Sequence, residues 1–131
     1  MNDEIRPIAG QGFAPPAGPY SHAVAFDRLL FVSGQAGLDP ATGRIVGADV
    51  ASQTERTLRN IETILRAAGS DLSHVLRCGV YLTDMGDFRE MNAVYARVFG
   101  DHRPARTTIQ AVAFPSPGAR VEIDAIAVLP G

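Results

Sequence analysis

Apolar residues recur along the chain with two different periods, and each period predicts one type of element. Between Asp49 and Gly69 they fall three or four residues apart, which is typical of one stripe on a helix of about five turns. The stripe consists of Val50, Thr54, Leu58, Ile61, Leu65 and Ala68. Asp49 is a favourable N-cap, and Gly69 is a favourable residue just after a helix end. The opposite face, which we expect to meet solvent, carries Glu55, Arg56, Arg59, Glu62 and Arg66.

A second, shorter helix is predicted to begin at Asp87 and to end at Gly100. Glu90 follows Asp87 by three residues, the spacing of a capping box. The apolar stripe of this helix consists of Phe88, Met91, Val94, Tyr95 and Val98.

Alternation with a period of two predicts strands. In residues 76–82, the buried set Leu76, Cys78, Val80 and Leu82 alternates with Arg77, Gly79 and Tyr81. Two apolar runs within residues 21–32 flank Asp27 and Arg28 and predict a hairpin. Residues 38–43 hold turn residues at turn spacing. Two further strands are predicted, one over residues 106–114 and one from about Arg120, with a Pro- and Gly-rich turn between them.

Together these elements predict one α+β domain over residues 1–131, with two helices covering one face of a mostly antiparallel sheet. The order of the elements favours a βαβ-type core with antiparallel edges. The second face of the sheet mixes apolar with charged side chains, namely Val112, Phe114, Glu122, Asp124, Ile126 and Val128. Such a face indicates either a subunit interface that contains a site or simple burial at strand ends.

Composition limits the classes of function. With 131 residues, 46% hydrophobic and 20% charged, the chain has the balance of an ordinary globular domain. A net charge of −2 argues against a nucleic-acid partner, because phosphate neutralisation needs a basic face. The charged N-terminus and the lack of a long apolar stretch predict no signal peptide and no membrane span. We therefore expect a soluble cytoplasmic protein.

The usual catalytic and metal motifs are missing from the sequence. The three histidines, His22, His74 and His102, have no ligand spacing, so we expect no metal site. A single cysteine, Cys78, excludes an internal disulfide, and its place among core residues favours an inert buried thiol. We find no nucleophile elbow and no phosphate-binding loop, and we expect no cofactor.

Several polar residues stand where pattern alone would not place them. Arg106 opens a strand after Pro104-Ala105, and Glu122 interrupts an apolar strand. A buried carboxylate needs a partner or a ligand, whereas a solvent-facing one needs neither, and both readings of Glu122 stay open. On pattern alone an ordinary surface role at a strand end is favoured for Arg106, and ordinary structural roles are also available to the other candidates, Tyr20, Ser33, Gly34 and Asn92.

Six segments in order resemble the RidA/YjgF family, also called L-PSP endoribonuclease-like, across nearly the whole chain. They are GPYSHAV (18–24), FVSGQ (31–35), QTERTLRNIETILRAAG (53–69), VYLTDMGDFREMNAVYARVF (80–99), PARTT (104–108) and VEIDAIAV (121–128). The resemblance implies a chorismate-mutase-like fold assembled as a homotrimer, in which three sheets form a central barrel and the sites lie between subunits.

The same resemblance implies hydrolysis of 2-imino or 2-enamino acids to 2-keto acids and ammonia, without metal or cofactor. Arg106 would bind the substrate carboxylate, since its planar fork offers two parallel hydrogen bonds. Glu122 would activate the attacking water as general base. The backbone carbonyl of Thr108, which replaces a common Cys, would accept a hydrogen bond from the imine nitrogen. Pocket-lining roles fall to Tyr20, Ser33, Gly34 and Asn92.

Two other functions stay open on the sequence. A regulatory trimer that binds keto acids without turnover would use the same Arg106 cleft. A ribonuclease, which the older family label suggests, is less favoured, because paired histidines and a basic groove are absent from the sequence.

Overall fold

The computed structural model describes residues 4–131 and arranges its strands in one mixed sheet. Residues 1–3 lie outside the described residues. They belong to the charged N-terminal segment from which the sequence predicts no signal peptide. The strand order is β1-β2-β3-β6-β4-β5. Along the chain the strands are β1 (Arg6–Pro7), β2 (Ala23–Phe26), β3 (Leu29–Ala36), β4 (Val75–Leu82), β5 (Ala105–Gln110) and β6 (Val121–Val128). The pair β4/β5 is parallel and the other neighbours are antiparallel.

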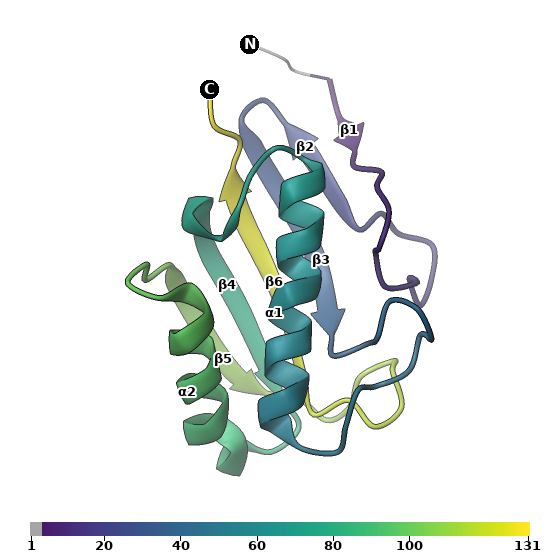
Figure 1. Ribbon diagram of the computed structural model, residues 1–131, viewed down its shortest axis with the longest axis vertical. Coiled ribbons are helices and arrows are strands. Elements are labelled where there is room, and N and C mark those ends of the chain that lie inside the picture. Colours follow the sequence, from purple (N-terminus) through teal and green to yellow (C-terminus); the bar gives the residue numbers. More distant parts are fainter. Residues whose placement is uncertain (1–3) are drawn as a thin grey trace.

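Two α-helices cover the same face of this sheet, α1 (Val50–Ala67) and α2 (Phe88–Phe99) (Figure 1). Two short 3-10 helices precede β4 and α2, η1 (Leu72–His74) and η2 (Met85–Asp87). The predicted α+β architecture, two helices on one face of a mostly antiparallel sheet, is confirmed. No helix within residues 4–131 combines the length and the apolar character needed to cross a membrane.

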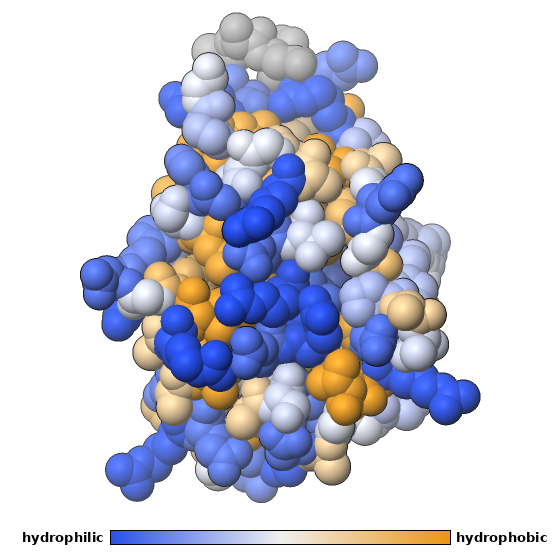
Figure 2. Space-filling model, viewed as in Figure 1, coloured by the Kyte–Doolittle hydropathy of each residue, from blue (hydrophilic) through white to orange (hydrophobic). Residues whose placement is uncertain are grey.

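The long helix forms where the sequence predicts it. The Asp49 side chain accepts a hydrogen bond from the Ser52 N–H at 2.8 Å and caps the first turn. Gly69 follows the helix with φ +86°, a left-handed conformation that glycine adopts without strain. Hydrophilic side chains gather on the helix-covered side of the molecule (Figure 2).

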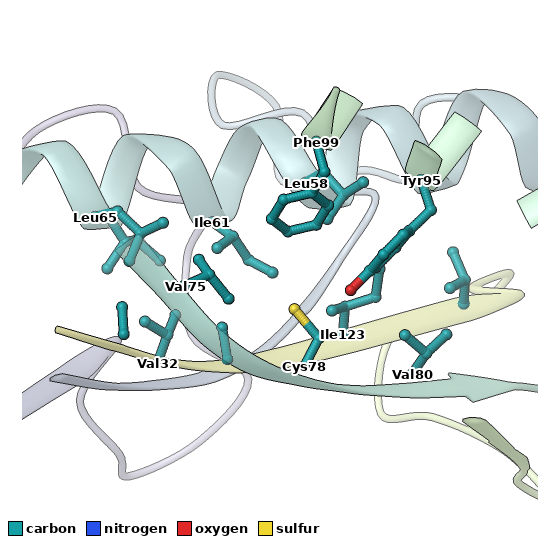
Figure 3. Close-up of a cluster of buried hydrophobic side chains, with 14 of the residues drawn as sticks. Val32, Leu58, Ile61, Leu65, Val75, Cys78, Val80, Tyr95, Phe99 and Ile123 are labelled. Atoms are coloured by element: carbon teal, nitrogen blue, oxygen red, sulfur yellow. The ribbon is translucent and has the colours of Figure 1, made fainter. Parts of the chain in front are cut away.

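The core lies between the helices and the sheet (Figure 3). Leu58 and Ile61 of α1 pack towards Ile123 of β6, and all three side chains are fully buried. Tyr95 and Phe99 of α2 complete the core beside α1, with their ring centroids 4.7 Å apart. Burying a side chain of this size stabilises the fold by about 1.5–3 kcal/mol. The sheet face opposite the helices carries no such cover within the described residues.

The predicted capping box is wrong. Asp87 has a helical backbone and makes no side-chain cap to α2. Its carboxylate instead accepts two hydrogen bonds from the guanidinium of Arg120, at 2.8 and 3.1 Å. An ion pair across the fold has thus replaced a local cap.

Three strand predictions also need correction. Leu76 is exposed, because a register shift between Val75 and Arg77 turns it out of the core. The strand predicted over 106–114 ends at Gln110, since its partner β4 ends at Leu82, and Val112 and Phe114 therefore lie outside the sheet. The edges are not both antiparallel, because the parallel pair β4/β5 forms one of them.

Candidate functional site

Arg106 lies on the helix-covered face of the sheet, in the edge strand β5. Its guanidinium carbon is 4.8 Å from the ring centroid of Tyr95 and 5.6 Å from that of Phe88. Its Nη1 also lies 3.9 Å from the sulfur of Met91. Aromatic faces attract a guanidinium, so α2 holds this cation without neutralising it. No ion pair between Arg106 and a carboxylate forms among the described residues.

Side chains of α2 and β4 lie beneath Arg106. The Tyr95 hydroxyl points to the Cys78 thiol, next to Arg106 in the β4/β5 pairing (Figure 3). Burial raises the pKa of the Cys78 thiol to about 11, which agrees with the predicted inert thiol. The His102 Nε2 lies 2.7 Å from the Val75 carbonyl oxygen and ties the segment before Arg106 to β4.

A hollow of about 300 Å³ opens beside Arg106, and its walls are Asn92, Tyr95, Ala96, Arg103 and Pro104. Three nearby oxygens are buried without a hydrogen-bond partner in the described part of the chain. Oδ1 of Asn92 and the Tyr95 hydroxyl belong to residues of this wall, and Oγ1 of Thr108 lies two residues along β5 from Arg106. Buried polar atoms without partners are uncommon and need an explanation. Together with an unneutralised cation, they are consistent with a hollow that receives a polar ligand.

Glu122 occupies a second, separate pocket of about 50 Å³ on the uncovered face of the sheet. Tyr20, Gly34 and the segment Ala14–Ala17 contribute to its walls. Gly34 leaves room for this side chain, because a Cβ at that position would clash with the Glu122 Oε1. The carboxylate therefore rests directly on the β3 backbone.

The Glu122 carboxylate is half-buried, and no hydrogen bond reaches it within the residues that the structure describes. Burial, and then the nearby charge of Asp124, raise its pKa above the ordinary value. Asp124 itself accepts hydrogen bonds from the Gly79 N–H and the Tyr81 hydroxyl, each at 2.9 Å. A desolvated carboxylate without partners is suited to accept a proton from a bound water.

Of the two remaining candidates, Tyr20 lies in the pocket wall and Ser33 does not. The Tyr20 hydroxyl accepts a hydrogen bond from the Ala17 N–H at 2.9 Å, which fixes the ring within the Pro-rich segment. The Ser33 hydroxyl donates to the Ser21 carbonyl at 2.7 Å. Tyr20 therefore shapes the space in front of Glu122, whereas Ser33 supports the strand next to Gly34.

The structure therefore divides the predicted site residues into two groups on opposite faces of the sheet. Arg106, Asn92 and Thr108 lie on the α2 side, whereas Glu122, Tyr20, Ser33 and Gly34 lie at or beside the uncovered face. Strand β5 is two strand spacings from β6, roughly 10 Å, and Arg106 is three residues along from the level of Glu122, roughly another 10 Å. Within one chain the two groups do not meet.

Sequence reasoning did not identify the residues that surround these side chains. Phe88 and Tyr95 were assigned only to the helix stripe, although their rings hold Arg106. The spacing of Tyr95 on that stripe gave no signal for the contact, which depends on how α2 packs on β5. No group of three or more His, Cys, Asp or Glu side chains within residues 4–131 is placed to hold a metal ion.

The chain is similar in sequence and in fold to known proteins. The family model described as Endoribonuclease L-PSP matches residues 12–129. Over 129 residues the chain is 46% identical to a bovine protein named 2-iminobutanoate/2-iminopropanoate deaminase, covering 98% of this chain and 93% of the relative. It is 52% identical over 118 residues to the protein DfrA of Myxococcus xanthus, covering 88% and 89% of the two chains. The crystal structure of the yeast protein YEO7 superposes with a TM-score of 0.92 at 33% identity, covering 97% of this chain and all of that one.

Proposed function

Because the chain belongs to the Endoribonuclease L-PSP family, we propose that it hydrolyses 2-imino and 2-enamino acids, such as 2-iminobutanoate and 2-iminopropanoate, to 2-keto acids and ammonia. The observation that carries this proposal is the 46% identity, over nearly the full chain, to a protein named for that deamination. We further propose a cytoplasmic location.

In the proposed mechanism Arg106 binds the substrate carboxylate through two parallel hydrogen bonds. The guanidinium is already held by Tyr95 and Phe88, so little conformational freedom is lost on binding. Asn92 and the Thr108 carbonyl would supply the polar contacts to the rest of the substrate head, with the Thr108 carbonyl facing the imine nitrogen.

Glu122 then takes a proton from water as the oxygen attacks the electrophilic carbon of the protonated imine. The carbon–nitrogen double bond becomes a single bond, and protonated Glu122 then passes its proton to the amino nitrogen, which restores the carboxylate. The carbon–nitrogen bond breaks, and the departing ammonia takes the hydroxyl proton and leaves the keto acid. Water is the only co-reactant, and the raised pKa of Glu122 makes it a stronger base.

This mechanism requires a second chain, because Arg106 and Glu122 face opposite sides of one sheet. We propose a homotrimer in which the hollow beside Arg106 of one subunit meets the Glu122 pocket of its neighbour. The uncovered side of the sheet offers apolar contact area, since large hydrophobic side chains on its strands are exposed: Phe26, Leu29, Phe31 and Ile109. A surface of this kind is typical of a subunit interface.

The test is a coupled assay in which a pyridoxal-phosphate dehydratase releases 2-iminobutanoate from threonine. Wild-type protein is expected to remove the imine faster than buffer alone. Arg106→Ala should lower kcat/KM roughly thirtyfold to several-thousandfold. This factor corresponds to about 2–5 kcal/mol of lost binding free energy, because the carboxylate of the bound substrate is left buried and unpaired. Arg97→Ala is the matched control, since this exposed α2 arginine pairs with Glu55, away from either pocket.

Binding of 2-ketobutanoate without faster imine loss would instead support a regulatory trimer. Salt-dependent RNA binding with RNA cleavage would support the ribonuclease.

A further inference from the structure

The position of Glu122 depends on its backbone, because no hydrogen bond to its carboxylate forms within residues 4–131. The carboxylate lies against Gly34, where a Cβ would clash with it. A catalytic base must be held within a fraction of an ångström. Whatever fixes the start of β6 therefore also fixes Glu122.

Gln53 of α1 provides that anchor. Its side chain is completely buried, and its Oε1 accepts a hydrogen bond from the Arg120 N–H at 2.7 Å. Its Nε2 donates to the Gly118 carbonyl at 3.1 Å and to the Gly47 carbonyl at 2.8 Å. One amide thus ties both the turn before β6 and the loop before α1 to the start of the helix. Its contact with Arg120 lies two residues upstream of Glu122.

The same residue also meets the end of β3. A Cβ on Gly37 would lie 2.9 Å from both the Cα and the carbonyl oxygen of Gln53, so α1 rests directly on the backbone there. Gly37 lies three residues beyond Gly34, the residue that supports the Glu122 carboxylate. Gln53 therefore lies between the two strand ends that form the floor of the Glu122 pocket.

We propose that Gln53 is a positioning residue for the deamination, whose buried amide fixes the start of β6 and so holds the Glu122 carboxylate against Gly34. This role rests on the proposed function, because it assumes that Glu122 activates water. Gln53 itself lines neither pocket, and it acts through the backbone of β6.

Two substitutions separate positioning from simple stability. Gln53→Met keeps the shape of the side chain but removes all three hydrogen bonds, whereas Gln53→Glu keeps an acceptor for the Arg120 N–H. Ser70→Ala is the matched control. The buried Ser70 hydroxyl donates to the Val128 carbonyl at 2.8 Å, so it anchors the same strand at the end remote from Glu122.

For each variant, kcat and KM for 2-iminobutanoate are measured together with the affinity and stoichiometry of 2-ketobutanoate binding. The stoichiometry counts folded sites, so a loss of folded protein does not lower the normalised kcat. A misplacement of about 1 Å costs about a hundredfold in rate. We expect Gln53→Met to lower kcat per site towards that limit, Gln53→Glu to lower it less, and both to keep wild-type affinity for 2-ketobutanoate.

Ser70→Ala should keep wild-type kcat per site even though it destabilises the fold. If Gln53→Met does not fold, the same inference follows when Gln53→Glu has a lower kcat per site and Ser70→Ala keeps the wild-type kcat per site. Wild-type kcat per site in either folded Gln53 variant would overturn it, as would an equal loss in Ser70→Ala. Absence of imine hydrolysis by the wild type is a different result, because it removes the proposed function itself.

Discussion

The Arg106 hollow and the Glu122 pocket are built by opposite means. Arg106 is held by other side chains, namely the rings of Tyr95 and Phe88 and the sulfur of Met91. Glu122 has no such partners among residues 4–131 and rests on backbone, with Gly34 beneath it and Gln53 anchoring its strand.

This difference determines which changes each region tolerates. On the α2 side, a change of side chain alters the binding group while the strand stays in place. On the β6 side, the chemistry depends on strand register and on a glycine, so small backbone shifts matter. A substrate held between two such regions would be gripped by one subunit and hydrolysed by groups of the other.

The largest expected effect on activity comes from disabling one region in each of two variants, so that the intact Arg106 hollow and the intact Glu122 pocket lie on different chains. Arg106→Ala and Glu122→Gln should each lose most activity, the second by about 10²–10⁴ in kcat because it removes the general base. Glu122→Gln should still bind 2-ketobutanoate through Arg106. Mixed and reassembled one to one, the two variants should recover about a quarter of wild-type activity, because that fraction of shared sites receives both native residues.

Imine hydrolysis measured before and after exchange of subunits checks this result. Each variant reassembled with itself is the control and should stay inactive. No recovery in hetero-oligomers that native mass spectrometry shows to have formed would mean that one chain supplies both residues, contrary to their placement on opposite faces.

Local sequence patterns were sufficient to locate the long helix, but they did not predict which distant residues and strands pair with one another. The apolar stripe and the Asp49 and Gly69 caps located α1, because these signals act within a few residues. The Asp87 capping box was wrong because Arg120, distant in sequence, takes the carboxylate. The outward turn of Leu76 follows from a register shift in strand pairing, which alternation alone does not encode.

For the site the limit was similar. Motifs were sufficient to single out Arg106 and Glu122, and the structure places each in a pocket. Their separation on two faces follows from the strand order β3-β6-β4-β5, which is decided by long-range pairing. Gln53 gave no signal in the sequence, since one polar residue in a helix looks the same whether it is solvated or buried against three backbone groups.

A smaller effect should follow when the backbone support of Glu122 is altered. In Gly34→Ala the new Cβ would clash with the Glu122 Oε1, so the carboxylate must move. We expect kcat to fall roughly tenfold, since displacement of a catalytic group by less than 1 Å has this order of effect. Affinity for 2-ketobutanoate should stay near wild type, because Arg106 is untouched.

Steady-state kinetics checks this prediction, with Gly86→Ala as the matched control. A Cβ at Gly86 also meets a carboxylate oxygen, that of Asp84 at 3.0 Å, but neither residue lines a pocket with Arg106 or Glu122. Equal kinetics of Gly34→Ala and wild type would show that the close contact has no catalytic consequence.

The smallest expected effect is a displacement of the pH profile. Burial, and then Asp124, raise the pKa of Glu122, and a general base acts only when deprotonated. The rate should therefore fall as the pH drops through this raised pKa. Asp124→Asn removes the second cause, so the acid limb of the kcat profile should move to lower pH while the plateau is kept.

The amide side chain introduced by Asp124→Asn can still accept from the Gly79 N–H, so the fold is expected to persist. Asp39→Asn removes a carboxylate from the turn before α1 and should leave the acid limb in place, which separates a local effect from a change in net charge. An acid limb that moved to higher pH, or not at all, would mean that Glu122 does not titrate as the base. Glu122 would then be only a residue of the pocket wall, and of the two regions only the one around Arg106 would keep its proposed chemical role.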